Sequence, residues 1–210
     1  MKRTFLIAFA AAAFLAVPAL ARADTATYCF TSFSATTWDS TPTQIVDCNT
    51  ADGTNDNNNG HHVHLDASEY TSGGSGTITK VELRVYYKNN WAASATTRNN
   101  VAQLVPYFGG TSEGSAYNDA LGNHATAGWS AYFDITSDAS APASWSWSDI
   151  AGLDVDLIDD RPSSGQITVY RVEMRVTYTP AGDSTQARTL RLFEGFVIKL
   201  VSGTIKLLGQ

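Results

Sequence analysis

The chain has 210 residues, of which 43% are hydrophobic and 16% are charged, and its formal net charge is −6 at pH 7. This length is sufficient for one sizeable hydrophobic core. Phosphate backbones repel an acidic surface, so the charge argues against a nucleic-acid partner.

Residues 1–23 have the three parts of a secretory signal peptide. Lys2 and Arg3 form a positive start, Phe5 to Leu20 is almost wholly apolar, and Ala21-Arg22-Ala23 offers small residues for cleavage. The apolar run is short for a bilayer span, so a retained anchor is the less favoured interpretation. We expect export to the cell surface or medium, with the periplasm as the alternative. Removal of the three basic residues in this segment takes the net charge from −6 to −9, and the mature chain contains no predicted membrane span.

Cys29 and Cys48 are the two cysteines of the chain. An even count in an exported protein indicates a disulfide, with free or metal-binding thiols as the alternative. The bond would join a predicted strand, Thr27–Phe33, to the segment around Ile45 and Val46. Closing a loop of this length contributes on the order of 3 kcal/mol in the chain-entropy model.

Short alternating runs follow, separated by clusters of Gly, Asn, Ser and Asp, and helix signals are nearly absent. Val81–Tyr87 and Tyr170–Tyr178 have the clearest period of two. In the second run, the residues expected to face the core are Tyr170, Val172, Met174, Val176 and Tyr178. Since the other face of each run is charged, these strands are typical of antiparallel sheets packed as a sandwich.

Weaker strand patterns complete the prediction. They lie around Val63 and Leu65, and at Val101–Phe108, Trp129–Ile135 and Leu153–Ile158. About eight strands of this spacing predict an all-β antiparallel sandwich of jelly-roll type. We expect one such domain over residues 24–180, a polar linker over residues 181–186, and a C-terminal β-hairpin or strand extension over residues 187–210.

Three segments resemble a known family in their order along the chain. They are "GTITKVELRVYY", "WSWSDIAGLDVDL" and "ITVYRVEMRVTYTP", between Gly76 and Pro180. Together they resemble a jelly-roll pattern of bacterial surface, extracellular-fibre and phage-tail proteins, over about half of the chain. The resemblance consists of strand patterns without an invariant site. It implies a non-catalytic module used for assembly, adhesion or glycan contact, and it transfers no functional residue.

Residues 52–66 include a partial match to a calcium-binding loop. The matching places are taken by Asn55, Asn57, Asn59, Gly60 and Asp66. The pattern lacks the first Asp and the final Glu, and no flanking helices are predicted. An Asn/Gly-rich turn is therefore the favoured interpretation.

Two pairs of side chains are candidate metal ligands. His62 and His64 share one face of a predicted strand, and Asp154 and Asp156 share one face of another. Alternate residues on a strand lie about 6.6 Å apart, so the histidines need a carboxylate from a neighbouring strand to hold a divalent metal. Solvated side chains are the favoured interpretation, with calcium at the aspartates as the alternative. Two aspartates without a glutamate give little support to a glycosidase pair.

Gly110–Gly114 matches the Gly-x-Ser-x-Gly string of a nucleophile elbow around Ser112. That motif functions on a strand-to-helix turn with a partnered histidine, whereas here it lies in a predicted loop of a β-rich chain. We therefore predict no enzymatic activity.

Trp145 and Trp147 are expected to share a strand face, and Trp91 lies within the same predicted sandwich. Exposed aromatic rings bind sugar rings by stacking. These three residues are the candidate glycan platform, and burial in the core is the alternative.

The last 24 residues are apolar and basic. Phe196–Val201 and Thr204–Leu208 predict a hairpin, which is marginal alone in water and must dock on something. The apolar residues expected to mediate assembly are Leu190, Leu192, Phe196, Ile198, Leu200, Ile205 and Leu207. Residues 187–210 carry a net charge of +3 and residues 24–186 one of −12, which favours docking between them. Docking on its own domain completes the fold, docking on the next subunit builds a fibre, and contact with a membrane surface or secretion machinery is the third option.

The sequence thus predicts a secreted, non-enzymatic structural protein that self-associates through strand edges and the C-terminal segment. A carbohydrate-binding or adhesive module that contacts polysaccharide is the alternative. No cofactor is required by this prediction, and calcium is the candidate.

Overall fold

The structure is a computed structural model of the whole chain. It describes residues 23–66, 68–70, 73–90, 102–119, 124–161 and 165–181, and the backbone of residues 188–191, 197–201 and 204–208. The predicted signal segment up to Arg22 and the candidate Trp91 lie outside the described residues.

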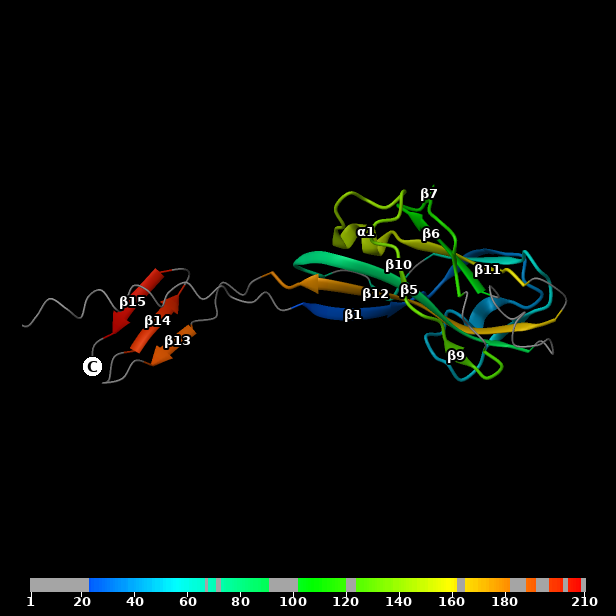
Figure 1. Cartoon of the computed structure of the whole chain (residues 1–210), viewed down its shortest axis with the longest axis horizontal. Helices are drawn as coiled ribbons and strands as arrows, with labels where there is room; N and C mark the ends of the chain where they lie inside the picture. Colours follow the sequence, from blue (N-terminus) through cyan, green and yellow to red (C-terminus); the bar gives the residue numbers. More distant parts are fainter. Residues whose placement is uncertain are drawn as a thin grey trace, which may run out of the picture.

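Two antiparallel sheets form a sandwich (Figure 1). The first sheet has the order β1-β12-β5-β10, with β3 pairing with β12 and β9 pairing with β5. Its strands are β1 (Asp24–Cys29), β3 (Thr54–Asp56), β5 (Thr77–Asn89), β9 (Gly128–Trp129), β10 (Phe133–Asp134) and β12 (Ile167–Thr179).

The second sheet has the order β2-β4-β11-β6-β7, and β8 also pairs with β6. Its strands are β2 (Phe33–Thr36), β4 (His62–Leu65), β6 (Ala102–Phe108), β7 (Ser112–Glu113), β8 (Tyr117–Asn118) and β11 (Asp154–Asp159). Two short helices, η1 (Pro42–Gln44) and α1 (Trp147–Ala151), lie in the connections.

The strand order is that of a jelly roll. β2 and β3 are added strands outside the jelly-roll order, and β7 with β8 and β9 with β10 each count as one strand. Eight strands then remain. They form two four-stranded orders, β1-β12-β5-β10 and β4-β11-β6-β7, and the chain changes sheet at nearly every step. The predicted all-β jelly-roll sandwich is therefore confirmed.

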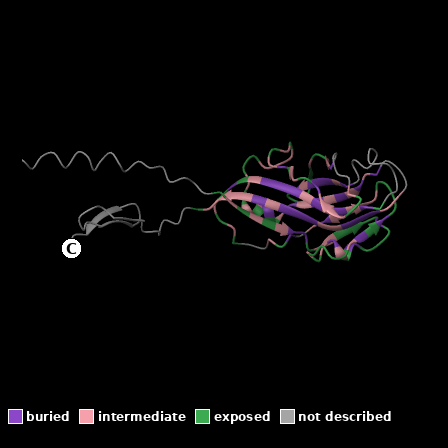
Figure 2. Cartoon of the chain, turned by 60° about the horizontal axis from the view of Figure 1, so that its bottom comes forward, coloured by how far each residue is buried: buried purple, intermediate pink, exposed green. Residues whose placement is uncertain are grey.

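The core lies between the sheets, and the buried residues follow the strands (Figure 2). Its fully buried members include Val63, Leu65, Val81, Leu83, Val85, Tyr87, Val155, Leu157, Val172, Met174 and Val176. Alternation of these residues with polar ones along each strand fixes the register, because a shift by one residue would turn each apolar set toward water.

Tyr170 departs from the predicted pattern. The register of β12 with β5 shifts between Val169 and Arg171, so Tyr170 is the extra residue of a β-bulge. Val169 takes the buried position, and the ring of Tyr170 lies 5.4 Å from that of Tyr86 on the outward side. The prediction that Tyr170 faces the core is therefore wrong.

The outward face of β5 and β12 carries paired charges. Arg84 lies opposite Glu173 and Glu82 opposite Arg175, and each arginine forms an ion pair with the glutamate facing it. The ring of Tyr132 packs against the guanidinium groups of both arginines, at 4.3 and 3.5 Å. Both glutamates are only 3% exposed under this cover, so the pairs are shielded from water, unlike ordinary surface ion pairs.

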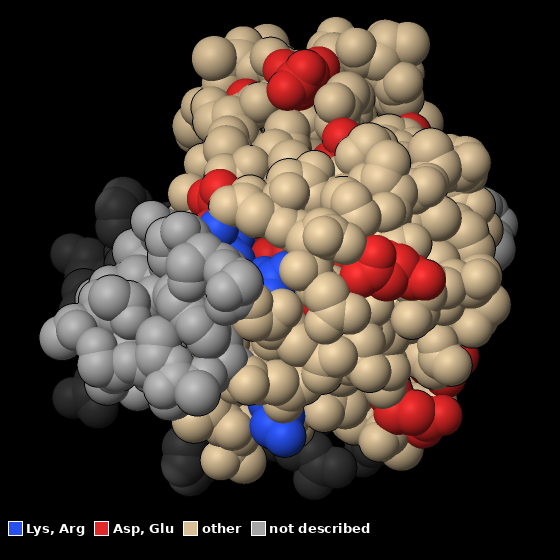
Figure 3. Space-filling model, turned by 90° about the vertical axis from the view of Figure 1, so that its right-hand side faces the viewer, with Lys and Arg blue, Asp and Glu red and all other residues tan. Residues whose placement is uncertain are grey.

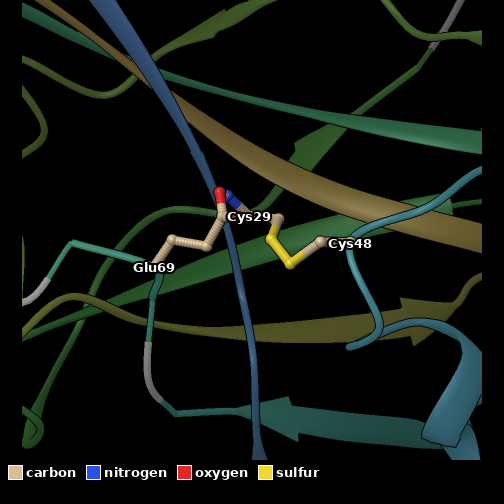
Figure 4. Close-up of side chains that lie close together, drawn as sticks. All are labelled: Cys29, Cys48 and Glu69. Carbon is tan, nitrogen blue, oxygen red and sulfur yellow. Dashed lines mark hydrogen bonds between the residues drawn. A yellow bond between two sulfur atoms is a disulfide. The ribbon is translucent and has the colours of Figure 1, made fainter.

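The predicted disulfide joins Cys29, the last residue of β1, to Cys48, and their Cα atoms lie 5.6 Å apart. Glu69 lies beside it (Figure 4): its carboxylate accepts a hydrogen bond from the Cys29 backbone N–H at 3.1 Å. The two sulfur atoms are bonded to each other, so they offer no thiolate to a metal ion.

The C-terminal residues form a third, three-stranded antiparallel sheet, β13-β14-β15 (Figure 1). Its strands are β13 (Arg188–Arg191), β14 (Val197–Val201) and β15 (Thr204–Leu208). Among the described strands, these three pair with one another and with none of the sandwich. The predicted hairpin thus has β13 as a third strand, and the side chains assigned to assembly lie outside the described residues.

The helices in the described part of the chain include none that is both long and apolar enough to cross a membrane.

The disulfide gives the first testable prediction. Removing it in the Cys29→Ala/Cys48→Ala variant is expected to lower the free energy of unfolding by on the order of 3 kcal/mol, because the unfolded chain gains the entropy of an open loop. Urea unfolding followed by tryptophan fluorescence measures the change. The natural chain should lose a similar amount in reductant, whereas the variant should not respond. An unchanged midpoint in the variant contradicts this role.

Candidate functional site

A surface pocket of about 330 Å³ lies beside the end of β12 and is surrounded by aromatic side chains. Its lining residues, which we call the aromatic pocket, are Tyr28, Glu69, Tyr70, Gly73, Gly74, Ser75, Trp147 and Tyr178. β1 supplies Tyr28, β12 supplies Tyr178, α1 supplies Trp147, and the segment between β4 and β5 supplies the rest. Four separate parts of the chain therefore meet at one site.

The aromatic rings form a connected group. Trp147 has its ring centroid 5.3 Å from that of Tyr70 and 5.0 Å from that of Tyr178, and Tyr28 lies 5.3 Å from Tyr70. The indole N–H of Trp147 donates to the carbonyl of Gly76 at 3.3 Å. The partly buried ring is thus held at both its apolar surface and its polar edge.

Gly74 allows the chain to close over this indole. A Cβ at position 74 would lie 2.2–2.7 Å from three ring atoms of Trp147, so any larger residue would displace the ring or the backbone. Gly76 has a φ of +103°, and a Cβ there would lie 2.1 Å from the carbonyl oxygen of Thr179. The two glycines therefore set the shape of this wall of the pocket.

Hydroxyl and carboxylate groups supply the polar part of the pocket. The Tyr70 hydroxyl accepts a hydrogen bond from the Gly74 N–H at 3.0 Å. Burial, and then the nearby hydroxyls of Tyr178 and Tyr70, raise the pKa of Tyr28, so this phenol remains a hydrogen-bond donor. Flat apolar rings combined with a few oriented polar groups are typical of small-ligand sites.

The predicted pairing of Trp145 with Trp147 on one strand face does not occur. Ser146 caps α1 through a capping box with Asp149, so Trp147 begins a helix. Trp145 points elsewhere: its N–H donates to the carbonyl of Thr136 at 3.0 Å, and its ring packs edge-on against Phe108. Trp147 therefore belongs to the aromatic pocket and Trp145 does not.

The tyrosines of the pocket were missed by the sequence reasoning. Tyr28 and Tyr178 lie on neighbouring strands because β1 pairs with β12, with Tyr28 opposite Met174. Tyr70 lies in an irregular segment whose apolar and polar residues do not alternate, so the sequence gives no indication of where its side chain points. The sequence signal that could have indicated the site is the pair Gly73-Gly74, which marks a close approach of backbone to another group.

A second group of polar side chains lies on the outer face of the second sheet. Asp156 of β11 is directly opposite His64 of β4, and its carboxylate lies 2.6 Å from the His64 Nδ1 atom. Asp154 lies 4.0 Å from Nε2 of the same ring. His62 is apart from them, with its Nδ1 atom 3.4 Å from the Thr37 hydroxyl. Three of the four predicted metal ligands are thus brought together. Burial raises the pKa of Asp154, and the charge of His64 partly opposes this effect.

The residues that match the calcium-loop pattern do not lie together in the structure. Asn55 lies in β3 of the first sheet, whereas Asp66 follows β4 of the second sheet. Asn55 accepts a hydrogen bond from Thr168, Asn57 accepts one from Gln166, Asn59 donates to the Arg161 carbonyl, and Asp66 accepts one from Ser32. These side chains therefore stabilise separate turns and do not surround a common point.

Asp39, Asp56 and His61 form a cluster that the sequence reasoning did not single out. Their ligand atoms lie within 4.8 Å of one another. The Asp56 carboxylate, however, already accepts hydrogen bonds from the Asp39 and Asn58 N–H groups. The Arg161 guanidinium lies 4.0 Å from Asp56 and would repel a metal ion. This cluster is better described as a hydrogen-bond and ion-pair network around the buried Asp56 than as a metal site.

The surroundings of Ser112 do not form a nucleophile elbow. Ser112 is exposed in the two-residue strand β7 and is followed by no helix. His124 is engaged elsewhere, with its Nε2 atom 2.9 Å from the carboxylate of Asp119. The small pocket beside Ser112 is lined by Phe108, Gly109, Ser140, Pro142 and Asp149.

Fold and pocket together define the class of this protein as a jelly-roll β-sandwich with a surface aromatic pocket. No protein-family model matches the sequence, and no curated protein matches it either. Solved structures give matches of low identity. A truncated AlyQ with CBM32 and alginate lyase domains aligns at 12% identity and a TM-score of 0.44, over 79% of this chain and 37% of that one.

Two further solved structures are similar at the same level. The infectious bursal disease virus Gx strain aligns at 11% identity and a TM-score of 0.31, over 77% of this chain and 34% of that one. The Agl-KA catalytic domain aligns at 10% identity and a TM-score of 0.32, over 81% of this chain and 29% of that one. The chain thus spans about a third of the length of each, and the similarity is one of architecture.

The buried network around Arg161 predicts a pH dependence of stability. Burial raises the pKa of Asp159 from 3.8 to about 7. The hydrogen bond and charge of Arg161 act in the opposite direction, and the nearby Asp56 raises the pKa further. The folded state therefore binds this proton more tightly than the unfolded state, and the contribution of Asp159 to the free energy of unfolding falls as pH rises from about 4 to about 7.

The Asp159→Asn variant isolates this effect, because it cannot ionise. Loss of the ion pair with Arg161 changes the free energy of unfolding of the variant by an amount that does not depend on pH. Relative to the natural chain, the variant should gain stability as pH rises through this window, with no further change above about pH 8. Urea unfolding at a series of pH values measures the difference. A difference that stays constant from pH 4 to pH 8 contradicts the raised pKa.

Proposed function

We propose that this chain is an exported, non-catalytic module that binds polysaccharide through the aromatic pocket. The observation that carries the proposal is the gathering of Trp147, Tyr28, Tyr70 and Tyr178 around one open space of about 330 Å³. This volume lies at the small end of ligand sites, which span about 300 to 1,000 Å³, and suits one or two sugar rings.

The chemistry of the pocket matches a sugar. Its aromatic faces offer large apolar area at little cost in conformational entropy, as stacking on a pyranose ring requires. The Tyr28 hydroxyl, the Glu69 carboxylate and the backbone of Gly73–Ser75 can exchange hydrogen bonds with sugar hydroxyls. These few polar groups would fix the orientation of the bound sugar.

Charge narrows the class of sugar to neutral or amino sugars. The lining residues include one carboxylate, Glu69, and neither lysine nor arginine. A uronate or sulfated sugar in the pocket would meet the Glu69 carboxylate with no lysine or arginine beside it in the lining. The opposite end of the sandwich, viewed in Figure 3, carries acidic side chains spread over its surface and basic ones in small patches.

Export and the absence of catalysis are part of the same proposal. The signal-like segment before Asp24 and the Cys29–Cys48 disulfide both support an oxidising compartment outside the cytoplasm. The Nε2 atom of His124 faces Asp119 at 2.9 Å, and the hydrogen bonds of the described residues include none between His124 and Ser112. This supports a non-catalytic role, since nucleophile and base must lie within hydrogen-bond reach.

Binding through the aromatic pocket is tested on an array of neutral, amino and acidic polysaccharides. The natural chain should be retained by neutral or amino glycans, and Trp147→Ala should reduce the affinity at least about tenfold, since loss of an aromatic platform costs upward of 1.4 kcal/mol. Trp145→Ala is the matched control, because it removes an equally large ring outside the pocket.

A more conservative substitution distinguishes an effect on glycan binding from an effect on folding. Tyr28→Phe keeps the ring and removes the hydroxyl, so its urea midpoint should be nearly unchanged while its affinity falls. Retention of no glycan by the natural chain, or equal losses in the Trp145 and Trp147 variants, would overturn the proposal.

Self-assembly through the C-terminal segment is the second candidate function. The observation that favours it is the sheet β13-β14-β15, in which β13 and β15 are edge strands within the described residues. Unpaired strand edges pair readily with another chain. The basic charge of residues 187–210 and the acidic charge of the sandwich also favour contact between subunits.

Electron microscopy of the negatively stained chain tests assembly. Filaments that lengthen with protein concentration are expected from the natural chain, and a variant that ends at Ala181 should remain monomeric. Ile205→Lys supplies the point-mutation control, because it places a charge within β15 without shortening the chain. Monomers at every concentration of the natural chain would be incompatible with this role.

A further inference from the structure

His64 is held between two carboxylates on the outer face of the second sheet. Its Nδ1 atom lies 2.6 Å from Asp156 and its Nε2 atom 4.0 Å from Asp154, both on the neighbouring strand β11. The side chains of His64, Asp154 and Asp156 are 22%, 20% and 16% exposed, so an ion from solvent can reach them. The group is separate from the aromatic pocket, with which it shares no residue.

The orientation of the imidazole is that of a metal ligand. A carboxylate only accepts, so His64 donates its Nδ1–H to Asp156. Metal binding requires a neutral imidazole, and loss of the Nε2 proton would leave a lone pair directed toward Asp154. Ligating histidines in proteins almost always donate their other ring N–H to a carboxylate or carbonyl in this way. Tyr107 of β6 fixes the ring further, since its own ring packs edge-on against His64 at 5.3 Å.

The charge around His64 is unbalanced. Within the described residues, no lysine or arginine forms an ion pair with Asp154 or Asp156. The two carboxylates thus face the imidazole without a lysine or arginine as counter-ion.

We propose that His64 Nε2 and Asp154 bind a divalent transition-metal ion, with Asp156 as the residue that orients His64. An imidazole nitrogen with carboxylate oxygens suits Zn²⁺ better than Ca²⁺, which takes oxygen ligands alone. Two ligand atoms of a tetrahedral zinc site are about 3.3 Å apart, so a small rotation of Asp154 or His64 closes the 4.0 Å separation.

Calorimetric titration of the metal-free chain with ZnCl₂ tests the site. We expect saturable binding near one zinc per chain, lost in His64→Ala and in Asp154→Asn. Asp156→Asn should weaken binding by about 10- to 100-fold, the usual effect of removing an orienting partner. His62→Ala is the matched control: it removes a histidine from the same strand face and should leave the affinity unchanged.

Nitrogen-15 NMR of the histidine rings gives a readout that needs no variant. The chain has four histidines. On addition of zinc, the Nε2 resonance of His64 should shift to the range of a metal-bound nitrogen, while Nδ1 keeps its proton. Absence of saturable zinc binding, binding that survives His64→Ala, or an equal loss in His62→Ala would each overturn the proposal.

Discussion

The antiparallel pairing of β5 with β12 is the interaction on which the rest of the structure depends. Both strands have 13 residues, and they lie at the centre of the first sheet. Their inward side chains, such as Val85 and Val172, are fully buried in the core. Their outward side chains form shielded ion pairs under Tyr132, so each face of the pair is stabilised by a different interaction. Loss of one partner in such a pair leaves a buried charge, which costs more than the pair itself contributes.

The long strands were predictable because their side chains alternate without interruption. The same alternation placed charged side chains on the outward face of both strands, and in the structure Arg84 and Glu173 pair there across the sheet. The jelly-roll class followed from the number and spacing of the weaker runs. The disulfide was predictable from the even number of cysteines in a chain with a signal-like start.

Local irregularities decided what was not predictable. The bulge at Tyr170 reverses the face of one residue and leaves no mark in the alternation of its neighbours. The capping box at Ser146 turns an apparent strand into a helix, and so separates Trp145 from Trp147. Both candidate sites also depend on which strands are neighbours. The pairing of β4 with β11 places Asp156 opposite His64, and nothing in either strand alone specifies that partner.

The disulfide and the aromatic pocket are physically connected through Glu69. Its N–H donates to the Cys29 carbonyl at 2.8 Å, and its carboxylate accepts from the Cys29 N–H at 3.1 Å. The adjacent residue Ser68 forms a β-bridge with Phe30. The segment that carries Tyr70 and Gly74 is therefore anchored to β1 at the residue that bears the disulfide. Because reduction would loosen this anchor, the shape of the pocket depends on the disulfide remaining oxidised.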